Sequence, residues 1–205
     1  TRLAVDDGAL VRVSSPLGSV VMRATVTDTQ RPGDIFVPMH WNDRYTAQGR
    51  INTLVSAHTD PYSGQPESKH GVAAVAPLPA AWHGLLLSRR RLQLDSTYWS
   101  CNRIAGAWRY RLSGTFMPDA WPTQARALLC AAQQDVGWIE YLDQAGSRYR
   151  AARLVNGRLE SCLFIAPSAE LLPDSGWLET LFAAAALDAP QRHSLLTGRA
   201  PQGSD

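Results

Sequence analysis

Residues 10–28 read LVRVSSPLGSVVMRATVTD, and this stretch indicates that the N-terminal part of the chain is β-structure. Apolar and polar residues alternate in Leu10–Ser15 and again in Ser19–Asp28, which is the period of a half-buried β-strand. Between them, Pro16-Leu17-Gly18 supplies residues that are typical of a turn. The sequence therefore predicts two strands joined by a turn, at the start of a unit built mainly of β-structure.

A long polar segment, residues 39–71, follows a short apolar strand expected at Ile35–Val37. It is rich in His, Asn, Asp, Ser, Gly and Pro, and it has no periodicity beyond one helical turn near Ile51–Val55. Another strand is expected at Val72–Val75, where the segment ends. A loop of this length inside a compact domain is typical of a binding element or of disorder.

Three pieces of this segment and its approach carry polar groups of several kinds: residues 31–43, 50–54 and 59–70. Such a mixture fits a ligand that is rich in ring nitrogens and negatively charged. Amides match the donor and acceptor edges of a heterocycle, and an ammonium group neutralises phosphate. The groups are the amides of Asn52 and Gln65, the hydroxyls of Thr53 and Ser63, the carboxylates of Asp60 and Glu67, and the ammonium of Lys69.

Beyond a boundary at Pro77-Leu78-Pro79, the sequence predicts a small α+β domain, a β-meander with helices. Asn156-Gly157, between two apolar runs, is the strongest short hairpin signal, because both turn positions need a positive φ. Helices are expected at Pro118–Gln134, from Asp174 and Ser175 through Ala186, and at Pro190–Thr197. Strands are expected at Trp108–Leu112, Trp138–Leu142, Ser147–Val155 and Arg158–Ile165.

Composition excludes several classes of protein. The 205 residues are 45% hydrophobic and 19% charged, with a formal net charge of +2, which is ordinary for a soluble globular chain and too balanced for a nucleic-acid or membrane binder. The three cysteines form no CxxC pair, which favours a reducing, cytoplasmic compartment and no metal site within this chain. Because the chain begins at Thr1 without a methionine, we expect a piece of a longer protein.

The N-terminal motifs, in order, resemble a known family. The pattern VRVSS…G…A.VTD..RPG.IFVP.HWND, followed by IN.L….TDP.SGQPE.KH, is similar to the C-terminal molybdopterin-dinucleotide-binding domain of the molybdopterin oxidoreductase superfamily. Within it, bacterial assimilatory nitrate reductases are the nearest resemblance. The match covers about Gly8 to Leu78 and implies a double-psi β-barrel for residues 1–78.

The resemblance also implies which residues bind the cofactor. Asn52 and Lys69 take the places of an asparagine and a lysine that contact the pterin dinucleotide in the family. His40 and Trp41 then lie near the pterin, at the end of a barrel strand. Asp60 and Ser63 are expected to order the loop. No residue of this chain is expected to be catalytic or to bind metal.

The second unit has its own resemblance. Residues 138–166 and the tail LLTGRAPQGSD are similar to the end of assimilatory nitrate reductases and to a small domain late in NAD(P)H-dependent nitrite reductases. This resemblance implies a domain over residues 79–189. Residues 190–205 then form a short helix and a tail that leads to a possible [2Fe–2S] domain. The cysteines of such a cluster are not in this sequence.

Together these resemblances imply a C-terminal fragment of a nitrate reductase that reduces nitrate to nitrite in nitrate assimilation. The fragment would clamp molybdenum bis(molybdopterin guanine dinucleotide) and be inactive in isolation, with an iron–sulfur cluster elsewhere in the parent chain. Its partners would be the upstream domains and an electron donor, either a reductase or a ferredoxin or flavodoxin, and neither nucleic acid nor membrane.

Other interpretations stay open at this point. A different member of the superfamily, such as a formate dehydrogenase, shares the barrel and acts on another substrate. The chain could also be a non-catalytic protein-interaction module. Residue by residue, Lys69 taken alone reads as a solvated loop lysine. Asn52 reads as a helix cap, and His40 and Trp41 as packing at the barrel rim.

Overall fold

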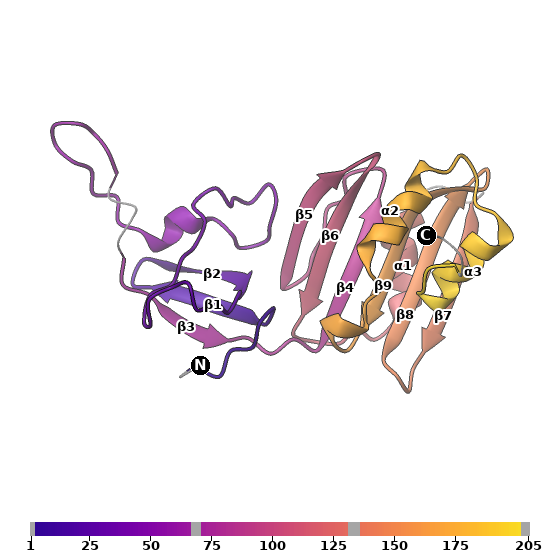
Figure 1. The fold of residues 1–205 in the computed structure, drawn as a ribbon, viewed down its shortest axis with the longest axis horizontal. Coiled ribbons are helices and arrows are strands. Elements are labelled where there is room, and N and C mark those ends of the chain that lie inside the picture. The colour runs from indigo at the N-terminus through magenta and orange to yellow at the C-terminus, as the bar shows by residue number, and fades with distance from the viewer. Residues whose placement is uncertain (1–2, 67–70, 131–135, 202–205) are drawn as a thin grey trace. The chain divides into compact units, whose positions relative to one another are not determined.

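The computed structural model describes residues 3–66, 71–130 and 136–201 of the 205-residue chain. Its chain divides into two compact units, Thr1–Ala80 and Ala81–Asp205, and each is described by itself below. Figure 1 shows their elements. The bounds expected from the sequence for three segments, 1–78, 79–189 and 190–205, stay a prediction.

The N-terminal unit contains a three-stranded antiparallel sheet in the order β2-β1-β3. Its strands are β1 (Leu10–Ser15), β2 (Gly18–Arg23) and β3 (Ala74–Pro77), and a short 3₁₀ helix, η1 (Ile51–Leu54), packs against β2. The turn at Pro16-Leu17 joins β1 to β2 with Ser15 opposite Gly18, so the two strands expected around residues 10–28 are present. Alternate residues of β1, Val11 and Val13, enter the small core.

Parts of the expected β-structure of this unit are absent. The strand expected at Ser19–Asp28 ends at Arg23. Ala24 still exchanges backbone hydrogen bonds with Gly8 and Ala9, but the next bond, from the Val26 N–H, goes to the Asp7 side chain, so the ladder does not continue. Ile35–Val37 forms no strand. Within the described residues the sheet stays open, with β2 and β3 as its edges, and no closed barrel is found. Alternating apolar residues make a strand only where a partner strand is available.

The C-terminal unit is built on a six-stranded antiparallel sheet in the order β5-β6-β4-β9-β8-β7. Three of its strands, β7 to β9, form the predicted meander, in which Asn156 and Gly157 turn the chain with φ of 50° and 79°. The strand bounds are β4 Trp82–Ser88, β5 Tyr98–Ile104, β6 Ala107–Gly114, β7 Gly137–Asp143, β8 Arg148–Val155 and β9 Arg158–Ala166.

Helices cover both faces of this sheet (Figure 1). The helix α1 (Trp121–Cys130) packs with Ala125 and Leu129 on one face, called the α1 face here. On the opposite face, the α2 face, lie α2 (Ser175–Ala183) and α3 (Ala189–Thr197). A short 3₁₀ helix, η2 (Ala169–Leu171), precedes α2. The expectation of a mainly β, α+β chain is therefore confirmed.

The caps explain where the helices of the second unit begin and end. Asp174 caps α2 by accepting a hydrogen bond from the Gly176 N–H, as its sequence predicts. A capping box of Asp188 and Gln191 starts α3, and Gly198 ends it with φ of 66°. The expected end of α2 at Ala186 is wrong, because the backbone is already extended at Ala184. Among the described residues no helix is long and apolar enough to cross a membrane.

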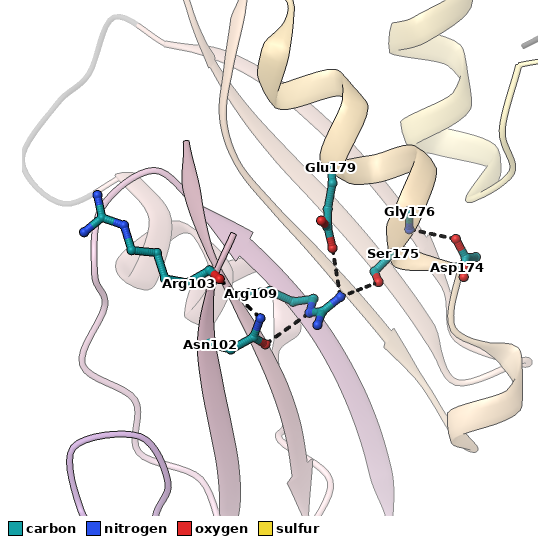
Figure 2. A network of polar contacts seen from close by, with 7 residues as sticks. All are labelled: Asn102, Arg103, Arg109, Asp174, Ser175, Gly176 and Glu179. Atoms are coloured by element: carbon teal, nitrogen blue, oxygen red, sulfur yellow. Dashed lines mark hydrogen bonds and ion pairs between the residues drawn. The ribbon is translucent and has the colours of Figure 1, made fainter. Parts of the chain in front are cut away.

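A polar network fixes α2 to the β5–β6 hairpin (Figure 2). The Arg109 guanidinium donates to the Ser175 hydroxyl at 2.9 Å and to the Glu179 carboxylate at 2.8 Å, both on α2. Its Nε donates to the Asn102 side-chain oxygen at 3.2 Å. Because one planar guanidinium joins three partners on two elements, α2 is held in one orientation on the sheet.

Candidate functional site

The geometry of η1 decides which way the predicted ligand residue Asn52 faces. Side chains three apart in a 3₁₀ helix lie above one another, and here Ile51 and Leu54 are both buried in the core of the N-terminal unit. Asn52 and Thr53, between them, are exposed. Within the part of the chain that the structure describes, the Asn52 amide makes no hydrogen bond, so it is exposed to solvent and does not cap η1.

Close contact with β2 holds η1 in this position. A Cβ atom added at Gly18 would lie 2.9 Å from the Thr53 carbonyl oxygen, nearer than real Cβ atoms approach. Thr53 itself is fixed by its hydroxyl, which donates to the Arg50 carbonyl at 2.8 Å. Gly18 is therefore required for the close packing of the Asn52 turn against β2.

We expect Gly18→Ala to destabilise the N-terminal unit by about 1–3 kcal/mol, because inserting a methyl group into a packed contact forces backbone shifts. The measurement is hydrogen exchange of the η1 and β2 amides in the 205-residue chain. Gly71→Ala is the matched control, since a Cβ atom there meets nothing within 4 Å. Equal protection of η1 in both variants would contradict the close contact.

The segment that carries His40 and Trp41 is joined to the start of η1 by an ion pair. The Arg50 guanidinium lies 2.6 Å from the Asp43 carboxylate. Asn42 orders the turn between them, because its side-chain oxygen accepts the Arg44 N–H at 2.9 Å. Both groups of the ion pair are more than half exposed, so it directs the loop and adds little stability.

Asp60 and Ser63 come together in a compact loop beyond η1. The Asp60 Oδ1 accepts the Tyr62 N–H at 3.0 Å, the Ser63 N–H at 2.7 Å and the Ser63 hydroxyl at 2.9 Å. The hydrogen bonds from Ser63, and then the one from Tyr62, lower the pKa of Asp60. An open depression of about 480 Å³ is lined by this loop: His58, Thr59, Asp60, Ser63, Gln65 and Pro66.

The structure therefore brings the predicted site residues together only in part. Asp60 and Ser63 bond to each other, and His40 and Trp41 are tied through Asp43 to the turn that presents Asn52. No hydrogen bond among the described residues joins Asn52 to the Asp60 loop, which extends away from the sheet in Figure 1. Lys69 lies outside the described residues. The roles of all six residues stay predictions.

Two exposed apolar residues, Phe36 and Met39, lie close to His40 and Trp41 in the sequence, and the sequence did not single them out. Phe36 is 73% exposed, Met39 52% and Trp41 40%. The sequence did contain a sign of this exposure, because residues 35–41 are mostly apolar. Since Ile35–Val37 forms no strand, these side chains are not buried in the sheet. Several large exposed apolar side chains in one short segment are typical of a surface that another domain or a ligand covers.

The chemistry of the donor set fits a pterin dinucleotide. An exposed amide matches the donor and acceptor edges of a pterin or guanine ring, and an indole and a phenyl ring offer flat apolar contact to it. The same residues are poor metal ligands, and among the described residues no group of three His, Cys, Asp or Glu side chains is placed to hold an ion. Burial raises the pKa of the Cys101 thiol and that of Cys162, to about 12 for Cys162, so both are packing residues.

Comparison with known proteins identifies the N-terminal unit. A family model described as "Molydopterin dinucleotide binding domain" matches residues 1–73. Residues 1–73 are therefore similar to this family. A nitrate reductase of Klebsiella oxytoca is 37% identical over 199 residues, which are 94% of this chain and 22% of that protein. The resemblance to the C-terminal portion of a molybdopterin oxidoreductase is thereby confirmed.

Other relatives match a smaller part of the chain. The assimilatory nitrate reductase catalytic subunit of Bacillus subtilis is 36% identical over 75 residues, 37% of this chain and 10% of that protein. Formate dehydrogenase H of Escherichia coli is 34% identical over 77 residues, 38% of this chain and 10% of that protein. This chain thus spans about a fifth or less of the length of these relatives. No solved structure matches it significantly.

Proposed function

We propose that this chain is the C-terminal part of an assimilatory nitrate reductase and that its N-terminal unit clamps molybdenum bis(molybdopterin guanine dinucleotide). The proposal rests on the extent of the match to the nitrate reductase of K. oxytoca, which covers 94% of this chain and so includes the second unit. The match to formate dehydrogenase H covers 38%, the length of the dinucleotide-binding unit alone. The second unit is therefore the part that favours nitrate.

When bound, the cofactor supplies the two-electron chemistry that reduces nitrate to nitrite. The residues of this chain bind and orient it. The Asn52 amide hydrogen-bonds a ring edge of the dinucleotide, and the Lys69 ammonium neutralises its phosphate charge. His40 and Trp41 lie against the pterin and keep water from it. Asp60 and Ser63 hold their loop in shape without touching the ligand.

The rest of the enzyme completes this unit. The double-psi β-barrel of the family needs more strands than the open sheet of β1, β2 and β3 provides, so we infer that neighbouring parts of the parent protein close it. They would also cover Phe36 and Met39, whose exposure costs stability in a free unit. The parent carries an iron–sulfur cluster and receives electrons from a reductase, a ferredoxin or a flavodoxin in the cytoplasm. The isolated chain is inactive.

The test is an assay of the full-length protein that contains this chain, with a dithionite-reduced dye as electron donor for nitrate and an oxidising dye as acceptor for formate. We expect nitrite formation from nitrate and no oxidation of formate, and no turnover by the 205-residue chain alone. Formate oxidation without nitrite formation would replace the proposal by a formate dehydrogenase. A full-length protein that contains no pterin would support an interaction module instead.

A further inference from the structure

Residues 59–66 of the N-terminal unit, called the 59–66 loop here, are ordered by their own bonds. The first and last residues of the loop form an isolated antiparallel bridge. Inside it, the Asp60 N–H donates to the Gln65 carbonyl at 2.9 Å, and the Gly64 N–H donates to the Asp60 carbonyl at 2.8 Å. Every residue of the loop is exposed. The loop therefore keeps its shape without burying a residue in the core of its unit.

The residues next to Tyr62 hold the turn, and the Tyr62 side chain takes no part in it. The Asp60 carboxylate accepts hydrogen bonds from the Tyr62 N–H and from the N–H and hydroxyl of Ser63. Pro61 brings a fixed φ to the turn, and Gly64 has a φ of 67°, in the left-handed region that favours glycine. The Tyr62 side chain is 98% exposed. The shape of the loop therefore does not explain why an aromatic residue stands at this position.

A tyrosine in this setting is typical of an anchor at an interface. An aromatic side chain buries roughly 150–250 Å² when a partner covers it, and tyrosine is one of the residues that contribute most to binding energy at interfaces. The ordered backbone of the loop matters as well, because a loop already held in its bound shape loses less conformational entropy on binding. The 59–66 loop therefore displays Tyr62 in the way that a binding residue requires.

The comparisons and the exposed residues indicate where a partner for Tyr62 lies. The loop is inside residues 1–73, the part of the chain that is similar to the dinucleotide-binding family. This chain spans 22% of the K. oxytoca relative, so most of such a protein lies outside it. Among the described residues, ten exposed large hydrophobic side chains lie in the N-terminal unit and five in the second unit. The smaller unit therefore carries most of the apolar surface that is left for the rest of the protein to cover.

We propose that Tyr62 inserts into a pocket in the part of the parent protein that precedes this chain in the sequence. The pocket has apolar walls around the phenol ring and a backbone or side-chain group that hydrogen-bonds the hydroxyl, which can donate and accept. The contact fixes the 59–66 loop against the rest of the enzyme. The inference rests on the proposed function only in that the chain is part of a larger enzyme. It does not depend on the substrate or on the roles of Asn52 and Lys69.

The first test replaces Tyr62 of the full-length protein by a photoreactive benzoyl-phenylalanine, followed by irradiation and mass spectrometry of the cross-linked peptides. We expect a cross-link within one polypeptide, to a peptide upstream of Thr1. The same probe in place of Gln93, an exposed residue of the second unit, is the control and should not reach that peptide. The proposal is overturned by the absence of a cross-link from position 62, or by one to residues of this chain, to a second copy or to another protein.

Hydrogen exchange of the amides of residues 62–65 measures the same contact in solution. We expect these amides to exchange at least about thirtyfold more slowly in the full-length protein than in the 205-residue chain, the factor for an anchor of about 2 kcal/mol. In the full-length protein, Tyr62→Ala should remove most of this protection, and Tyr62→Phe, which retains the ring, should keep most of it. Equal exchange in the two proteins, or full protection in Tyr62→Ala, would refute the docking. Nitrate reduction is assayed on the same samples, so that a wrong substrate is recognised separately from a loop that does not dock.

Discussion

Phe164→Ala is expected to lower the free energy of unfolding of the second unit by about 3–5 kcal/mol, the cost of emptying a large aromatic site in a core. Phe164 is 2% exposed on β9, in the interior of the sheet, and it packs on the α2 face with Leu85, Leu178 and Phe182. Helices cover both faces here, so the neighbouring side chains have little room to collapse into the cavity.

Urea unfolding followed by tryptophan fluorescence measures this loss, since six of the seven tryptophans lie in the second unit and only Trp41 lies in the first. Phe116→Ala is the matched control. Phe116 is 85% exposed, and its loss should change stability by no more than about 0.5 kcal/mol. Similar midpoints for the two variants would mean that the core of the second unit is not packed as described.

Elements specified by local signals were predicted well. The Asn156-Gly157 hairpin, the Asp174 cap and the last helix ending at Gly198 depend on backbone conformations that only a few residue types adopt, so a short sequence suffices to place them. The β1–β2 connection belongs with them. These features need no knowledge of distant parts of the chain.

Elements that depend on partners were predicted poorly. Strand β4 was missed because helices bury both of its faces, and its near-continuous apolar sequence shows no alternation. Conversely, residues 24–28 alternate well and form no strand, because the backbone pairing with the residues before β1 stops at Ala24. Whether these positions form a strand depends on whether a partner strand lies beside them, and a single sequence does not show this.

In the candidate site, too, the features set by neighbouring residues could be predicted and those set by distant residues could not. The exposure of Asn52 could have been derived from Ile51 and Leu54, since apolar residues three apart in a 3₁₀ turn leave the residues between them outside. The bond between Asp60 and Ser63 follows from the Asx-turn pattern.

The second large effect is expected at the dinucleotide. In the full-length enzyme, Lys69→Ala should weaken cofactor binding about tenfold to a hundredfold, the cost of a charge-assisted hydrogen bond of about 1.5–3 kcal/mol. Asn52→Ala should weaken it about twofold to tenfold, because a hydrogen bond between neutral groups contributes about 0.5–1.5 kcal/mol. The measurement is molybdenum and guanine nucleotide per protein after purification, with nitrate reduction assayed in the same samples.

The controls decide whether these losses come from contact with the cofactor. Gln93→Ala removes an exposed amide of the second unit and should leave molybdenum and nucleotide content unchanged. Lys69→Arg keeps the charge and should retain more cofactor than Lys69→Ala. If Asn52→Ala and Lys69→Ala both keep full cofactor content while activity falls, these side chains do not clamp the dinucleotide. Their effect would then lie in how the loop from residue 39 to residue 71 meets the rest of the enzyme.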